Sequence, residues 1–183
     1  MDNGACSYRR YLAGDDNGLA DIIREYRDGL IFFLNGFVND PDTAEDLAED
    51  VFFRLAVKKP RFREKSSFKT WLYAIGRNEA LTYLRRNKIT YIPLEALPET
   101  PDGGDFESDF LRTEKKIALN RCLSRLSDEY RQTLRLYYFE GFSAKEIAGI
   151  MKRSARGVNT LLYRARQAAK RELEKEGFDD EDL

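Results

Sequence analysis

The sequence predicts an all-α protein of two small helical domains, a bundle and a helix-turn-helix, joined by a flexible acidic linker. Apolar residues recur at three- and four-residue steps, the period of one helix face, along most of the chain. No segment shows the alternation of apolar and polar residues that marks a strand. Residues 89–112 hold three of the five prolines and a Gly-Gly pair among acidic side chains, a composition typical of a linker.

Charge divides the chain in the same way. Its 183 residues suffice for one ordinary domain or two small ones, and the net charge is only -1. Residues 61–88 nevertheless carry 8 basic and 2 acidic side chains (net +6), and residues 115–175 carry 15 and 6 (net +9). Two separate polyanion contacts would produce this pattern, although a solvated face is the commoner cause of clustered charge. We expect domains at 1–88 and 113–176, the linker at 89–112 and an acidic tail at 177–183.

The first domain is expected to hold a bundle of three or four helices, each with its own start signal. An aspartate at 15 or 16 precedes the first, Asp40-Pro41 opens the second, and Ser66-Ser67 can cap the third. Pro60 stops the second helix because proline cannot continue it. These signals predict helices near residues 19–37, 41–58 and 68–86.

The second domain has the layout of a helix-turn-helix. After a helix around Ile117 to Leu126, Ser127 caps a helix through Tyr138 that Gly141 ends. A capping box opens a short helix at 143–151, and Ser154 can cap a last helix. Two short amphipathic helices that meet across a tight connection are typical of the DNA-binding motif.

The last helix carries an apolar stripe from Val158 to Leu173, which leaves a polar face outward. Arg suits guanine and Asn suits adenine in the major groove, while further cations contact phosphates. A basic surface helix of a bundle with no DNA contact would show the same pattern. The capping box, the short preceding helix and the net charge of +9 over residues 115–175 favour DNA binding. The candidate duplex-binding residues are Arg153, Ser154, Arg156, Asn159, Thr160, Tyr163 and Arg164.

The third helix and the loop before it combine cations with aromatic, amide and hydroxyl side chains. At about 100° per residue, Trp71, Asn78 and Thr82 fall on one stripe. Unstacked bases stack on rings and bond through their exposed edges, so this stripe suits a single strand. Packing of Trp71 inside the bundle is the plainer alternative, and alone it would be preferred. The candidate strand-binding residues are Phe62, Arg63, Lys65, Trp71, Asn78, Thr82 and Arg85.

The second helix carries an acidic face with an aromatic residue in its midst. The carboxylates could suggest a metal site, but the chain has no His and no matching ligands on a facing helix. A solvated acidic face is the usual explanation, and it leaves an outward Phe unexplained. We therefore expect a protein-docking surface anchored by Phe53. Its residues are Asp46, Glu49, Asp50 and Phe53.

Composition argues against an enzyme. The lack of His removes the commonest general base and the usual zinc ligands. Cys6 and Cys122 form no CxxC pair, and no apolar run is long enough to span a bilayer. We expect a reduced, cytoplasmic protein with both thiols free, no cofactor, no metal and no membrane insertion.

Two stretches carry a family resemblance. The sequences DTAEDLAEDVFFRL at 42–55 and FREKSSFKTWLYAIGRN at 62–78 look like region 2 of bacterial extracytoplasmic-function (ECF, group IV) sigma factors of the sigma-70 superfamily. Residues 123–173, above all FSAKEIA at 142–148 and LYRAR at 162–166, resemble region 4 of the same group. Region 3 is absent.

The resemblance implies a specificity subunit that directs core RNA polymerase to promoters and helps to open them. Region 2 would dock on the polymerase clamp helices through the acidic face and melt the minus-ten element. Phe62 and the 63–67 loop would hold a flipped base, whose extrusion costs a few kcal/mol. Region 4 would read the minus-thirty-five element as duplex. An anti-sigma protein would be a natural partner, since the docking faces must be masked when polymerase is absent.

Asn159, Leu161 and Arg156-Gly157 depart from the family pattern, which often has basic residues or a Gly-Thr pair there. Promoter preference therefore cannot be copied from a relative, and fewer cations should weaken the phosphate contacts. Two other readings remain. One is a stand-alone helix-turn-helix regulator with an N-terminal sensing or dimerisation domain, which would bind a palindromic duplex without polymerase. The other is a helical adaptor with no nucleic-acid role.

Overall fold

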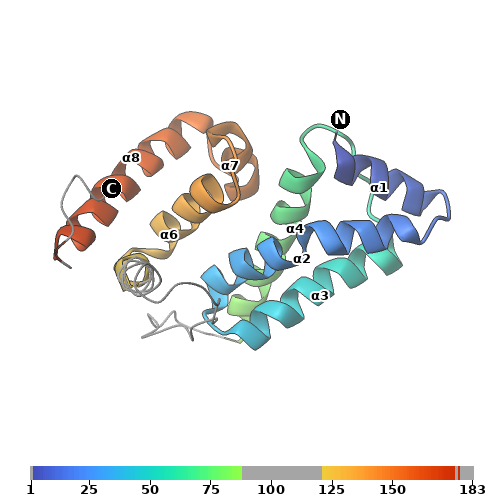
Figure 1. Cartoon of the computed structure of the whole chain (residues 1–183), viewed down its shortest axis with the longest axis horizontal. Helices are drawn as coiled ribbons and strands as arrows, with labels where there is room; N and C mark the ends of the chain where they lie inside the picture. The colour runs from blue at the N-terminus through green and yellow to red at the C-terminus, as the bar shows by residue number, and fades with distance from the viewer. Residues whose placement is uncertain (1, 88–120, 176, 178–183) are drawn as a thin grey trace, which may run out of the picture.

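The computed structural model describes residues 2–87, 121–175 and 177, and every regular element in these ranges is helical (Figure 1). The expectation of an all-α fold is confirmed. The linker at 89–112, residue Ile117 and nearly all of the acidic tail lie outside the described residues. The elements are α1 (Asn3–Leu12), α2 (Asn17–Val38), α3 (Pro41–Lys58), α4 (Phe68–Arg86), α6 (Asp128–Leu134), the π-helical turn η1 (Arg135–Phe139), α7 (Ala144–Met151) and α8 (Ala155–Lys175).

The helix start signals act as the sequence predicts at most positions. The side chains of Asp40, Ser67 and Ser143 accept hydrogen bonds from backbone N–H groups three residues later, and Ser143 and Glu146 form the full capping box. α3 ends at Lys58, two residues before Pro60. These caps satisfy N–H groups that the first turn of a helix leaves without partners.

Three local expectations need correction. Asp16 is the N-cap residue of α2 but makes no side-chain cap; the carboxylate of Asp15 accepts the N–H of Asn17 instead. Ser127 likewise precedes α6 without a capping hydrogen bond. The helix after it widens into the π-turn η1, which adds a residue to the turn and so shifts the side-chain phase. Tyr138 lies in this turn and is 59% exposed.

Helix α1 was not expected from the sequence. Its ten residues offer less than three turns of periodicity, and its inward side chains are largely tyrosines. The available signal was Asp2, whose side chain caps the helix, followed at three-residue steps by Ala5, Tyr8 and Tyr11, all of them buried.

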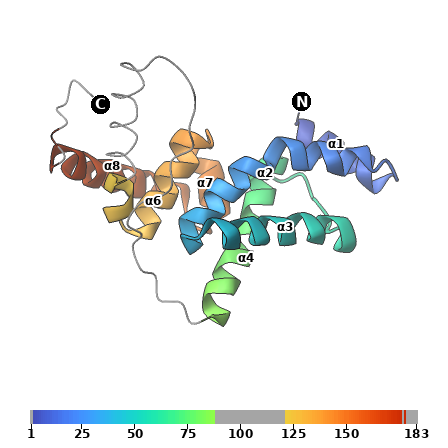
Figure 2. The same ribbon diagram turned by 60° about the horizontal axis from the view of Figure 1, so that its bottom comes forward.

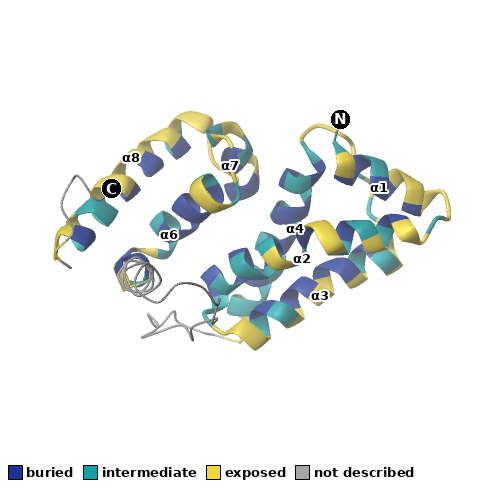
Figure 3. Ribbon diagram, viewed as in Figure 1, coloured by how far each residue is buried: buried dark blue, intermediate teal, exposed yellow. Residues whose placement is uncertain are grey.

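Helix α2 is the central element of the N-terminal half, and α1, α3 and α4 pack around it (Figures 1 and 2). Its inward face holds Leu30, Phe33 and Leu34, each at most 1% exposed. The buried faces of all four helices turn toward one another (Figure 3). Burial of large apolar side chains, worth roughly 1.5–3 kcal/mol each, holds this bundle together.

The two halves of the chain are in contact. Helix α7 packs on α4 and α6 packs on α2, and one cluster of buried residues runs from Ala5 to Leu162 through both halves. Two carboxylates of the C-terminal half reach across the contact. Glu140 accepts a hydrogen bond from the Tyr73 hydroxyl at 2.6 Å and pairs with Lys69 at 2.9 Å. Glu146 accepts hydrogen bonds from the hydroxyls of Ser67 and Thr70 at 3.1 and 3.2 Å.

Candidate nucleic-acid interface

The acidic face of α3 points to solvent as expected. Asp46, Glu49 and Asp50 are exposed, and the Phe53 side chain between them is 66% exposed. The flanks of the helix are tied to its neighbours by two ion pairs, from Arg27 on α2 to Glu45 and from Arg54 to Glu79 on α4. The buried side chains of α3, such as Val51 and Leu55, hold it in the bundle, and the two ion pairs add to this contact, so the carboxylates and the aromatic ring share one outward face.

Sequence reasoning missed one member of this face. Val57 lies one helical turn beyond Phe53 and is 61% exposed. A four-residue step on a helix places two side chains side by side, so the spacing from Phe53 was the signal that could have found it. Together the two residues form an apolar patch beside the carboxylates, which is the composition of a protein-docking surface rather than of a metal site.

The start of α4 carries a cluster of four aromatic rings. Trp71 has ring centroids of Tyr8, Phe62 and Phe68 at 5.5, 5.1 and 5.4 Å. Tyr8 and Phe68 are buried, whereas Phe62 and Trp71 are half-buried and keep part of their surface toward solvent. Trp71 thus packs in the bundle, as the plainer reading held, while part of the residue remains exposed to solvent.

The stripe that continues along α4 stays at the surface. Asn78 and Thr82 are half-buried, and Arg85 is exposed. The Thr82 hydroxyl donates to the carbonyl of Asn78 at 2.8 Å and accepts from Arg85 at 3.2 Å. The Asn78 amide is left on the same face as Trp71, two turns away along the helix.

The loop before α4 presents its cations outward. Arg63 and Lys65 are exposed, and Glu64 between them adopts a left-handed backbone with φ of 53°. The Glu64 carboxylate pairs with Arg9 of α1 at 3.2 Å. Phe62 turns inward, onto Phe68 and Trp71.

The outward face of α8 is as predicted. All seven candidate residues from Arg153 to Arg164 are exposed, with Tyr163 at 65%. The apolar stripe is buried at Val158, Leu161 and Ala165. The Ser154 hydroxyl accepts the N–H of Gly157 at 3.1 Å and so caps the helix despite the glycine in its first turn.

Cations gather where the two halves meet. Arg153 pairs with Glu129 of α6 and lies close enough to Arg77 of α4 to affect its ionisation. Burial and, second, the Arg153 cation lower the pKa of Arg77, and Glu129 partly offsets them. The positive charge of α4 therefore adjoins that of the helix-turn-helix.

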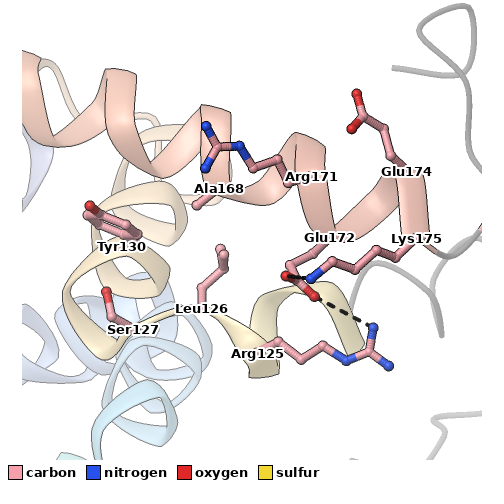
Figure 4. Close-up of a pocket in the computed structure, with 9 residues that line it drawn as sticks. All are labelled: Arg125, Leu126, Ser127, Tyr130, Ala168, Arg171, Glu172, Glu174 and Lys175. Carbon is pink, nitrogen blue, oxygen red and sulfur yellow. Dashed lines mark hydrogen bonds and ion pairs between the residues drawn. The ribbon is translucent and has the colours of Figure 1, made fainter.

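A pocket lies near the C-terminal end of α8 (Figure 4). Leu126, Tyr130 and Ala168 provide its apolar lining, and Glu172 at its rim pairs with Arg125 and Lys175. None of the candidate docking, strand-binding or duplex-binding residues lines it. Across the described ranges, no group of three or more Asp, Glu, Cys or His side chains could hold a metal ion, and no helix could cross a membrane. Cys6 and Cys122 form no disulfide.

Two family models match the chain in the order that these surfaces follow. Residues 22–89 match Sigma-70 region 2, and residues 116–168 match Sigma-70, region 4. The chain belongs to the sigma-70 family, in its ECF group of RNA polymerase sigma factors. The region 2 match contains α3 and α4, and the region 4 match contains α7 and the larger part of α8, the two helices of the helix-turn-helix. Helix α1 precedes the matched residues.

Similar proteins agree with this family. The sigma factor is 32% identical over 163 residues to RNA polymerase sigma factor YlaC of Bacillus subtilis, covering 87% of this chain and 94% of that protein. It is 30% identical over 161 residues to ECF RNA polymerase sigma factor SigM of the same organism, covering 88% and 98%.

Two solved structures share the fold of this sigma factor. CnrH, in complex with the cytosolic domain of CnrY, gives a TM-score of 0.69 at 17% identity over 95% of this chain and 99% of that one. The sigma factor RpoE of Bartonella quintana, in complex with the anti-sigma factor NepR, gives 0.64 at 23% identity over 84% and 97%.

Proposed function

We propose that this sigma factor directs core RNA polymerase to specific promoters and helps to open them, using three separate surfaces. The observation that carries the proposal is the order of the two matched regions together with the chemistry that each exposes. Region 2 carries an acidic and apolar face and a half-open aromatic cluster, whereas region 4 carries a basic helix face. A single chain with these surfaces can hold a protein, a melted strand and a duplex at the same time.

Polymerase docking is assigned to α3. Phe53 supplies an exposed ring of the kind that anchors protein interfaces, and Asp46, Glu49 and Asp50 surround it with negative charge. Complementary charge speeds association and excludes wrong partners, while the buried ring supplies affinity. Val57 extends the apolar part of this surface.

Strand capture is assigned to the loop and helix that hold the aromatic cluster. An extruded base needs a ring to stack on and a polar edge to bond, and Trp71, Phe62 and Asn78 offer both on one face. Arg63, Lys65 and Arg85 are exposed beside them and can meet the backbone phosphates. A pocket that exists before melting lowers the cost of opening, because the base leaves one stack for another.

Duplex reading is assigned to α8. Arg153 and Ser154 directly before α8 and Arg156 in its first turn are exposed, where a recognition helix enters the major groove. Asn159, Thr160, Tyr163 and Arg164 follow on the same exposed face. Arginine and asparagine can read base edges there, and the remaining contacts fix the helix on the phosphates.

Strand capture by the N-terminal half and duplex reading by the C-terminal half together require the two halves to separate on a promoter. Elements near minus ten and minus thirty-five lie about 25 base pairs apart, which is roughly 85 Å of duplex at about 3.4 Å per base pair. A compact chain of 183 residues has a radius of gyration of only about 16 Å. We infer that the contact between α4 and α7 parts when both elements are bound.

The proposal places the protein in the bacterial cytoplasm as a DNA-binding initiation factor rather than an enzyme. RpoE of Bartonella quintana is bound to the anti-sigma factor NepR in its solved structure. We extend this kind of partner to the present chain because its exposed docking face, with Phe53 and Val57, would otherwise stay open to nonspecific contacts.

Run-off transcription with core polymerase and a promoter library tests the proposal. The sigma factor is expected to direct initiation to a defined set of start sites. Trp71→Ala and Asn78→Ala should impair opening but keep core affinity, whereas Phe53→Ala combined with Asp50→Lys should lose core affinity. Asp28→Lys makes the same charge change on the neighbouring helix and should leave core affinity unchanged. Tight binding to a palindromic duplex with no response of polymerase would establish the stand-alone regulator instead.

A further inference from the structure

Helix α1 holds both ends of the loop that leads into α4. Ahead of the loop, the Tyr8 hydroxyl donates to the carbonyl of Pro60 at 2.8 Å. Behind it, the carboxylate of Asp2 accepts the N–H of Phe68 at 2.6 Å. Both bonds connect residues more than fifty positions apart, so they fix the loop ends against a separate element rather than against the loop itself.

Asp2 serves two helices with its two carboxylate oxygens. Oδ1 accepts the N–H of Ala5 at 3.1 Å and caps α1, while Oδ2 accepts the N–H of Phe68 in the first turn of α4. A helix leaves its first N–H groups without intrahelical partners, and its N-terminus favours negative charge. One carboxylate therefore stabilises both N-termini and sets the distance between them.

The Tyr8 ring of α1 is a buried member of the aromatic cluster and packs against Phe68 and Trp71. Its side chain is 1% exposed, and its ring centroid lies 5.5 Å from those of both Phe68 and Trp71. Phe62 packs on the same two rings at 5.6 and 5.1 Å. Burial and, second, the neighbouring Tyr11 raise the pKa of Tyr8 to about 12, so its hydroxyl remains a donor at neutral pH.

Helix α1 packs closely against the start of α4 at Gly4. A Cβ at Gly4 would lie 2.5 Å from a ring carbon of Phe68 and 2.6 Å from the hydroxyl oxygen of Tyr26. A side chain at that position would push α1 away from the cluster. The glycine thus permits the close approach on which the Asp2 and Tyr8 contacts depend.

We propose that α1 is a positioning element for strand capture, and that Asp2 and Tyr8 are positioning residues that hold Phe62 and Trp71 in place to receive a base. The inference rests on the proposed function, because it assumes that these rings meet the melted strand. Neither residue needs to touch DNA. Each acts through rings and backbone that are placed by contacts with α1.

The sigma factor contains a single tryptophan, so Trp71 emission reports the state of the cluster without any DNA. Tyr8→Leu removes the supporting ring, and Tyr8→Phe removes only the bond to Pro60. With the full chain folded by circular dichroism, Tyr8→Leu should raise acrylamide quenching of Trp71 about twofold, an estimate for a half-buried ring that loses one neighbouring face. Tyr8→Phe should change it little. Unchanged quenching in Tyr8→Leu would overturn the inference.

Holoenzyme assembled with the same variants then tests the role in strand capture. Tyr8→Leu should weaken binding of a single-stranded minus-ten oligonucleotide about tenfold, within the range of one lost base stack, with core affinity and duplex binding unchanged. Tyr73→Leu is the matched control, because it removes a tyrosine ring that is equally buried but faces Glu140 on the other half. It should leave oligonucleotide binding unchanged.

The outcomes separate the two proposals. If Tyr8→Leu loses core, duplex and strand binding in parallel, α1 is only a structural support and the inference is wrong. If the wild-type holoenzyme shows no preference for any minus-ten oligonucleotide while Trp71 quenching responds as expected, the strand-capture assignment fails and the positioning of the cluster stands as a structural result only.

Discussion

Replacing Glu140 with Gln should destabilise the protein by about 1.5–3 kcal/mol, the usual value of hydrogen bonds to a charged group. The Glu140 side chain is 9% exposed and receives the Tyr73 hydroxyl at 2.6 Å and Lys69 at 2.9 Å. Lys69 also donates to the carbonyl of Glu140 at 2.8 Å, and its side chain is 32% exposed. In the Gln variant the amide oxygen can still accept a hydrogen bond, but the charge that pairs with the Lys69 ammonium is lost; the Glu140 carbonyl and the rings of Tyr73 and Phe142 remain near it.

Urea unfolding followed by circular dichroism and Trp71 emission measures this cost. With a denaturant slope of about 2 kcal/mol per molar, the midpoint of Glu140→Gln should fall by about 1 M. Glu64→Gln is the control, because the Arg9–Glu64 pair is more than half exposed on both sides and should contribute at most about 1 kcal/mol.

A double-mutant cycle with Lys69→Met isolates the pair. Residues in direct contact show interaction energies of roughly 0.5–3 kcal/mol, so the double variant should lose clearly less than the sum of the singles. Strict additivity, or a Glu140→Gln midpoint no lower than that of Glu64→Gln, would refute the reasoning that this ion pair holds the two halves together.

Three further predictions follow from single contacts. Burial raises the pKa of Glu146, but hydrogen bonds from Ser143, Ser67 and Thr70 outweigh it and leave the pKa below its usual value. The ionised form of Glu146 therefore contributes to stability above the unfolded pKa of about 4.3, and this contribution is lost as the pH falls through the folded pKa. Glu146→Gln should reduce the loss of unfolding free energy at acidic pH. An equal loss in the variant and the wild type would contradict this. Arg164→Ala should lower the salt slope of duplex binding by about 0.9, and an unchanged slope would exclude a phosphate contact. Gly4→Ala should cost about 1–3 kcal/mol in unfolding experiments, whereas Gly14→Ala, with open space around it but a φ of 100°, should affect stability without raising Trp71 quenching.

Signals within a few residues of each helix end predicted most of the secondary structure. The capping side chains of Asp40, Ser67 and Ser143 lie within three residues of the N–H groups they satisfy, so their effect can be read from the sequence directly. The helical period likewise predicted that Phe53 and the α8 face point outward, since exposure follows from which side is apolar. The residue assignments to polymerase and DNA remain predictions, because exposure alone does not name a ligand.

Contacts between distant elements were beyond the reach of local pattern. Helix α1 has too few turns for periodicity to stand out, and its contacts with the rest of the bundle join Asp2 and Tyr8 to residues 66 and 52 positions away. The partial exposure of Trp71 also depends on this packing, since it is set by rings from three segments.

The sequence by itself determined two helical regions, each with a basic block, because helix formation and amphipathic faces depend on residues within a few turns of one another. Only the tertiary structure decided that α7 rests on α4 and that Glu140 and Glu146 find partners 67 to 79 positions earlier in the chain. Long-range pairing depends on the shape and polarity of two finished surfaces, and neither surface exists until its helices have packed.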